Sequence, residues 1–81
     1  MLTLYVEENC GYSKKAMDAL QALGLTAKLK YIEDVRILHE LIERGGQDQV
    51  PYLIDDEKRV EMYDSDKIVE YLNKTYSKKE L

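Results

Sequence analysis

Residues 49–72 read QVPYLIDDEKRVEMYDSDKIVEYL, and this stretch carries the densest structural pattern in the chain. Tyr52-Leu53-Ile54 is a short apolar strand, the polar residues 55–58 form a turn, and residues 59–62 return as an antiparallel partner. Ser65 then begins a helix. Its apolar positions, at helical spacing, are Ile68, Val69, Tyr71 and Leu72. The stretch therefore predicts a hairpin followed by a helix.

Toward the N-terminus, the pattern predicts two more strands, residues 2–6 and 27–32, and two more helices. The first helix begins at Tyr12 or Ser13 and stops at Gly24, and the second is closed by Gly45-Gly46. Their apolar positions are Ala16, Met17, Leu20 and Leu23, then Val35, Leu38, Leu41 and Ile42. The order β-α-β-α-β-β-α predicts an α/β fold, a four-stranded mixed sheet flanked by three helices.

Length and composition restrict the class of protein. The 81 residues suffice for one domain, 1–81, and 44% hydrophobic with 35% charged residues is typical of a soluble globular protein. A net charge of −4 argues against a nucleic-acid partner. Met1 to Val6 lacks the features of a signal peptide, and no segment reaches transmembrane length, so we expect no membrane association.

Cellular location follows from the single cysteine and the absence of a signal peptide. Free thiols persist in reducing compartments, so we expect a cytoplasmic protein. Lys78-Lys79-Glu80-Leu81 is close to an ER-retention tetrapeptide, but without a signal peptide we interpret it as a solvated tail.

Cys10 is the only cysteine, and it lies between a strand and the start of a helix. Backbone N–H groups at a helix start lack intrahelical partners and, with the helix dipole, favour a reactive thiolate. The amides of Tyr12 and Ser13, or the Ser13 hydroxyl, are the candidate donors. The alternative is a small buried apolar residue. Asn9 and Gly11, both loop formers, favour the reactive thiol.

Three short motifs carry a resemblance to known families. Cys10-Gly11-Tyr12-Ser13 resembles the Cys-Pro-Tyr-Cys site of glutaredoxins and the Cys-Gly-Phe-Ser site of monothiol glutaredoxins. Val50-Pro51 resembles the cis-proline loop of the thioredoxin superfamily. Asp64-Ser65 is similar to the acid-serine pair of glutathione transferase N-terminal domains. The resemblance covers nearly the whole chain and implies a thioredoxin/glutaredoxin fold.

The resemblance also implies roles for these residues. Cys10 would be the nucleophile, followed by the active-site residues Gly11, Tyr12 and Ser13. Glutathione, the co-substrate, would be bound by Tyr12, Val50, Pro51, Asp64 and Ser65. Val50 would offer its backbone to the cysteinyl part, next to a cis Pro51. Ser65 and its helix start would hold the γ-glutamyl carboxylate, and Asp64 its ammonium group.

Each of these residues also has an ordinary structural role open to it. Pro51 can simply begin a strand, Ser65 can be a helix N-cap, and Tyr12 can be an exposed aromatic residue. His39 is expected on the surface rather than as a catalytic base. Three further tyrosines are expected to be packing residues: Tyr5, Tyr31 and Tyr71.

The chain departs from the glutaredoxin pattern in two ways. Glu7 stands where dithiol glutaredoxins often have lysine, and Glu8 follows it. Carboxylates near Cys10 oppose thiolate formation, unless Lys14 or Lys15 compensates. The second cysteine of the dithiol site is absent, which excludes the dithiol mechanism.

Three functions remain open at this stage. The first is a monothiol thiol-disulfide oxidoreductase, a redox-active electron-transport enzyme whose partners are glutathione and glutathionylated proteins. The second is a [2Fe–2S] protein, in which two chains and two glutathione molecules supply four thiolates through Cys10. The third is an adaptor that uses the fold alone. The chain would be a monomer, or a homodimer if it binds a cluster.

Overall fold

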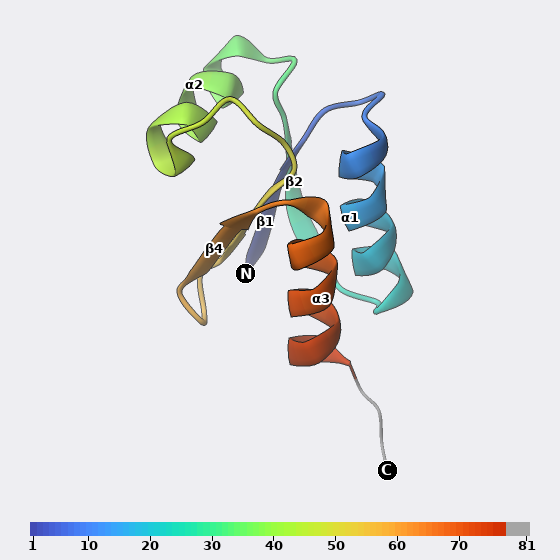
Figure 1. Ribbon diagram of the computed structural model, residues 1–81. Helices are drawn as coiled ribbons and strands as arrows, with labels where there is room; N and C mark the ends of the chain where they lie inside the picture. Colours follow the sequence, from blue (N-terminus) through green and yellow to red (C-terminus); the bar gives the residue numbers. More distant parts are fainter. Residues whose placement is uncertain (78–81) are drawn as a thin grey trace.

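The computed structural model describes residues 1–77 as a mixed sheet with helices on both faces (Figure 1). In chain order the elements are β1 (Leu2–Val6), α1 (Gly11–Ala22), β2 (Ala27–Tyr31), α2 (Val35–Gly45), β3 (Tyr52–Asp55), β4 (Val60–Tyr63) and α3 (Ser65–Tyr76). The predicted order β-α-β-α-β-β-α is confirmed. Lys78-Lys79-Glu80-Leu81, the predicted solvated tail, lies outside the described residues. None of the helices within residues 1–77 is long and apolar enough to cross a membrane.

The four strands follow the order β2-β1-β3-β4 across the sheet. β1 pairs with β2 in parallel, and β1 with β3 and β3 with β4 are antiparallel. The first pair needs a crossover, which α1 supplies, whereas β3 and β4 are joined by a short turn. β1 and β3 are therefore the central strands, and β2 and β4 are the edges.

Each face of the sheet has its own apolar core. Helices α1 and α3 lie side by side on one face, where the buried residues are Leu2, Leu4, Val6, Ala16, Leu20, Leu53, Ile68 and Leu72. Helix α2 covers the other face, with the smaller buried set Tyr5, Leu41, Tyr52 and Ile54. Successive strand residues point to opposite faces, which is why neighbours along β1 and β3 belong to different cores.

Some sequence-based expectations differ from the structure. Helix α1 begins at Gly11, one residue before Tyr12, because Cys10 already occupies the N-cap position. Strand β4 spans Val60–Tyr63 rather than 59–62. Tyr31, expected to be a packing residue, is 38% exposed because it lies on the edge strand β2. The expected burial of Tyr5 and exposure of His39 are confirmed.

Asp55, which the sequence placed in a turn, is the last residue of β3 and is 1% exposed. Its Oδ2 accepts hydrogen bonds from the hydroxyls of Tyr71 at 2.6 Å and Tyr76 at 2.5 Å. Burial by itself raises the pKa of this carboxyl, but the two hydroxyls and nearby backbone amides outweigh it and lower the pKa. Burial, and after it the hydrogen bond to Asp55, raises the pKa of Tyr71 to about 12. Asp55 thus ties α3 to the sheet in its ionised form.

Tyr76→Phe is expected to lower the free energy of unfolding at pH 7 by about 1.5–3 kcal/mol, the usual contribution of a hydrogen bond to a charged group. A carboxyl whose folded pKa is lowered stabilises the fold above its unfolded pKa, 3.8 for Asp55, and loses that contribution as the pH falls through the folded value. The difference between wild type and variant in urea unfolding should therefore shrink below about pH 4. Tyr31→Phe is the matched control, and an equal loss there would contradict the assignment.

Candidate functional site

Three tyrosines lie in one row across the sheet and fix the edge where the candidate segments meet. Tyr5 of β1 is paired with Tyr52 of β3, which is paired with Tyr63 of β4. Just beyond this row, β1 leads into the loop that carries the cysteine. Pro51 lies immediately before β3, and Asp64 immediately after β4. Strand pairing therefore brings three segments distant in sequence to the same edge.

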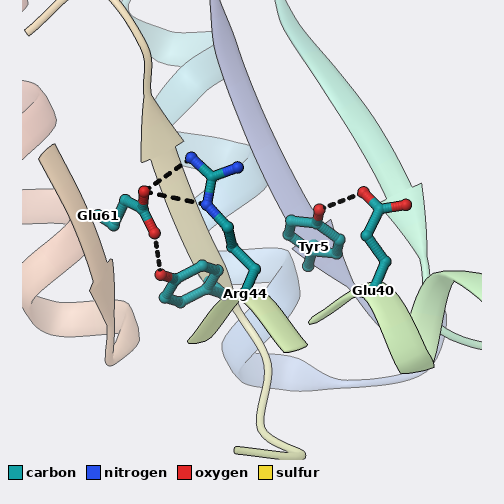
Figure 2. A network of polar contacts seen from close by, with 5 residues as sticks. Tyr5, Glu40, Arg44 and Glu61 are labelled. Carbon is teal, nitrogen blue, oxygen red and sulfur yellow. Dashed lines mark hydrogen bonds and ion pairs between the residues drawn. The ribbon is translucent and has the colours of Figure 1, made fainter. Parts of the chain in front are cut away.

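The tyrosine row also holds helix α2. The Tyr5 hydroxyl donates to Glu40 at 2.5 Å, and the Tyr52 hydroxyl donates to Glu61. Arg44 donates twice to Oε2 of Glu61, at 3.1 Å and 2.7 Å, as Figure 2 shows. Burial is the larger cause that raises the pKa of Tyr5 and of Tyr52, and the carboxylate that each hydroxyl contacts is the second cause. The hydrogen bonds from Arg44 lower the pKa of Glu61. Helix α2 is thus anchored through polar contacts around a small apolar core.

The loop between α2 and β3 is shaped by the third tyrosine. Helix α2 ends at Gly46, whose φ of 92° is a left-handed conformation that favours glycine. The Tyr63 hydroxyl then accepts a hydrogen bond from the Gln47 amide at 3.1 Å and donates to the Gln47 carbonyl at 2.9 Å. Tyr63 also lies so close to Gly45 that a Cβ atom there would collide with it. This loop ends at the Val50–Pro51 peptide bond, which is cis, as the resemblance to the thioredoxin superfamily implied.

A groove of about 400 Å³ opens at this edge of the sheet. It is lined by Tyr12, Gln49, Val50, Pro51, Asp64, Ser65 and Asp66. Five of these residues are the predicted glutathione contacts, so the fold gathers in one place residues from three separate segments. The volume lies within the usual range for small-molecule sites. Sequence reasoning missed Gln49 and Asp66, whose only signal was their position next to Val50 and Ser65.

The start of α3 forms one wall of the groove. The N-cap is Asp64, not Ser65 as the sequence allowed, and its Oδ1 accepts a hydrogen bond from the Asp66 amide at 3.1 Å. Asp64 has a φ of 82°, a conformation that costs a non-glycine residue about 1–3 kcal/mol and is found mainly at functional sites. Ser65 is the first helical residue and is 6% exposed. Lys15 of α1 forms an ion pair with Asp66 across the two helices.

Cys10 is the N-cap of α1, but its side chain accepts no hydrogen bond from the helix amides, so the expected donation from Tyr12 and Ser13 is not seen. It is partly exposed and is not sealed in the core. However, Cys10 and Gly11 do not line the groove: they belong to a second hollow, on the side of α1 that carries Lys14 and Met17. Tyr12, two residues from Cys10, is the α1 residue that reaches the groove. The cysteine therefore stands at the boundary between two hollows.

Ser13 and the two lysines have other partners than the sequence suggested. Ser13 is fully buried, and its Oγ accepts a hydrogen bond from the Glu7 amide at 3.1 Å, which fastens the cysteine loop to α1. Lys14 is paired with Asp18 at 3.2 Å, and Lys15 with Asp66. Both lysines are thus paired with carboxylates other than that of Glu7.

Comparison with known proteins gives one family. Residues 4–80 match the model of the glutathione S-transferase, N-terminal domain. The chain matches no curated protein. Similar solved structures include an epsilon-class glutathione S-transferase from the housefly Musca domestica, with 26% identity over 98% of this chain and a TM-score of 0.82. A second is glutathione transferase E6 from Drosophila melanogaster, with 28% identity over 98% of this chain and a TM-score of 0.81.

A third similar structure, the unclassified glutathione S-transferase 2 from Bombyx mori, has 25% identity over 96% of this chain and a TM-score of 0.83. These matches confirm the predicted thioredoxin-like fold. The chain spans 36–37% of the length of these three proteins. Both the family model and these structures support the transferase side of the sequence resemblance rather than glutaredoxins in particular.

Ser13→Ala is expected to lower the free energy of unfolding by about 1–3 kcal/mol, because it leaves the Glu7 amide without its buried acceptor. Urea unfolding measures the loss. Ser77→Ala, at an exposed serine, is the matched control. A Ser13→Ala protein as stable as the control would contradict the structural role given to this hydroxyl.

Proposed function

The chain belongs to the family of glutathione S-transferase N-terminal domains, and from that premise we propose that its groove binds glutathione and that Cys10 exchanges disulfides with it. The reaction is the removal of glutathione from protein mixed disulfides. One observation carries the proposal: Tyr12, Val50-Pro51 and Asp64-Ser65 line one groove that reaches to within two residues of the only thiol.

The groove offers complementary groups to each part of glutathione. The first N–H groups of α3 lack intrahelical partners and favour a carboxylate, which suits the γ-glutamyl end at Ser65. The Asp64 carboxylate suits the ammonium group beside it. The Val50 backbone lies in the groove beside Pro51 and can pair with the cysteinyl part as a short extended segment. Glutathione would then run from the start of α3 toward the start of α1.

The proposed chemistry needs one thiolate and a second glutathione. The Cys10 thiolate attacks the glutathione sulfur of the mixed disulfide, the old S–S bond breaks, and the protein leaves as a thiolate that takes a proton from water. A second glutathione thiolate then attacks the glutathione sulfur bonded to Cys10. This releases glutathione disulfide and restores Cys10. The mixed disulfide between protein and glutathione is thereby reduced to the protein thiol, and two glutathione molecules are oxidised to glutathione disulfide.

The other two sequence-based functions have less support. A [2Fe–2S] cluster needs four thiolates, which two chains and two glutathione molecules would supply through Cys10. The family model and the similar structures are glutathione transferases, and neither points to such an assembly. Nothing in the described part of the chain favours a cluster. A purely structural adaptor would not require a partly exposed thiol next to a groove with this lining.

Cys10→Ser is expected to abolish the release of glutathione from a glutathionylated peptide, because serine is not a usable nucleophile toward a disulfide. Turnover is followed with glutathione and a reductase that recycles glutathione disulfide. Ser77→Ala should keep wild-type turnover. Circular dichroism verifies that both variants are folded. Equal activity of the Cys10→Ser and wild-type proteins would overturn the proposal.

Asp64→Asn is expected to weaken glutathione binding about fivefold, as for the loss of one exposed charge pair. Asparagine still caps a helix, so the start of α3 is retained. NMR titration of the Cys10→Ser protein measures affinity without turnover. A glutathione analogue without the α-amino group should bind equally well to both proteins, and Asp56→Asn is the charge-matched control. Unchanged spectra with glutathione would favour the adaptor instead.

A further inference from the structure

A long hollow runs along the side of α1 that faces away from the glutathione groove. Its first part, about 580 Å³, begins at Cys10 and lies between the cysteine loop, α1 and Tyr31. Its second part, about 320 Å³, continues between α1 and strand β2. Met17 and Gln21 line both parts, so the two adjoin one another along α1. We call it the α1–β2 groove, defined by Cys10, Met17, Gln21, Leu25, Leu29 and Tyr31.

Strand β2 gives this groove an edge to which another chain can pair. It is an edge strand and, among residues 1–77, pairs only with β1, so within this range its outer backbone groups have no strand partner. Leu29 and Tyr31 project from the same face, toward the groove, and are 40% and 38% exposed. An extended segment beside β2 would place alternate side chains against this apolar surface. The five residues of β2 span about 16 Å, enough for several such side chains.

The cysteine end of the α1–β2 groove is negatively charged. Glu7 and Glu8 line it, are exposed, and form no ion pair with any other residue in the range 1–77. Lys14 also lines it, but its charge is matched by Asp18 at 3.2 Å. Charge complementarity therefore favours a cationic group next to whatever thiol approaches Cys10.

We propose that the α1–β2 groove docks an extended segment of another protein that carries a cysteine, apolar residues on one side of it, and lysine or arginine next to it. The inference rests on the proposed function, because the docked cysteine is the one whose glutathione Cys10 removes. Glutathione then occupies the groove at Pro51, and the protein segment occupies the other side of α1. The bonds made and broken are those of the exchange described above.

Four glutathionylated substrates test this docking. Three are peptides of one length: an apolar peptide with lysine beside the cysteine, the same peptide with glutamate there, and the lysine peptide with serine in place of its apolar residues. The fourth is the mixed disulfide of glutathione and 2-mercaptoethanol, which reports the chemistry without a peptide. We expect kcat/KM to be about tenfold higher for the lysine than for the glutamate peptide, with the ratio falling as salt screens the charges.

Variants locate the selectivity. Glu7→Gln/Glu8→Gln should bring the ratio between the lysine and glutamate peptides close to one. Any change in the reactivity of Cys10 cancels in that ratio, since both peptides meet the same thiol. Leu29→Ser should reduce the preference for the apolar over the serine peptide, whereas Val35→Ser, at an exposed valine of α2 outside the groove, should preserve both preferences.

The outcomes separate this inference from the function on which it rests. Turnover of the 2-mercaptoethanol disulfide with equal rates for all three peptides would overturn the docking segment and keep the proposed chemistry. No turnover of any substrate would overturn both. Sedimentation provides a further check: a dimer that Leu29→Ser dissociates would assign the groove to a second copy of this chain and overturn the inference.

Discussion

The pairing of Tyr5, Tyr52 and Tyr63 in one row across the sheet is the constraint from which the candidate site follows. The Tyr5 and Tyr52 ring centroids are 6.1 Å apart, and those of Tyr52 and Tyr63 are 4.4 Å apart. In an antiparallel sheet, a shift of one residue would turn these rings to the opposite face. The register thus decides that Pro51 and Asp64 emerge beside one another, and the Tyr63 hydroxyl holds the loop after α2.

The two faces of the sheet are stabilised in different ways. Between the sheet and helices α1 and α3, stability comes mainly from fully buried aliphatic side chains, with Asp55 accepting two tyrosine hydroxyls at the rim. Under α2 the apolar core is smaller, and partly exposed ion pairs such as Arg44–Glu61 contribute little individually. The α2 side, which shapes the loop ending in the cis bond, is therefore the less strongly held part of the site.

The position of Cys10 at the N-cap of α1 connects two surfaces of unlike chemistry. On one side lies the groove with the start of α3, where the Asp64 carboxylate stands beside the first N–H groups of that helix. On the other lies the α1–β2 groove, apolar along β2 and negative near Glu7 and Glu8. The residues that line these two surfaces come from distant parts of the chain.

Sequence alone determined the order of the elements, because this depends on local periodicity. The cis bond at Pro51 followed from the resemblance of Val50-Pro51 to the thioredoxin-superfamily loop, and the first helix begins one residue earlier than its pattern predicted. The sequence also supplied the residue types that line the groove. Only the tertiary structure decided that Ser13 binds the Glu7 amide, that Asp55 is buried rather than part of a turn, and that Cys10 belongs to the second hollow. Such features depend on strand register and on contacts between residues far apart in sequence, which no local pattern specifies.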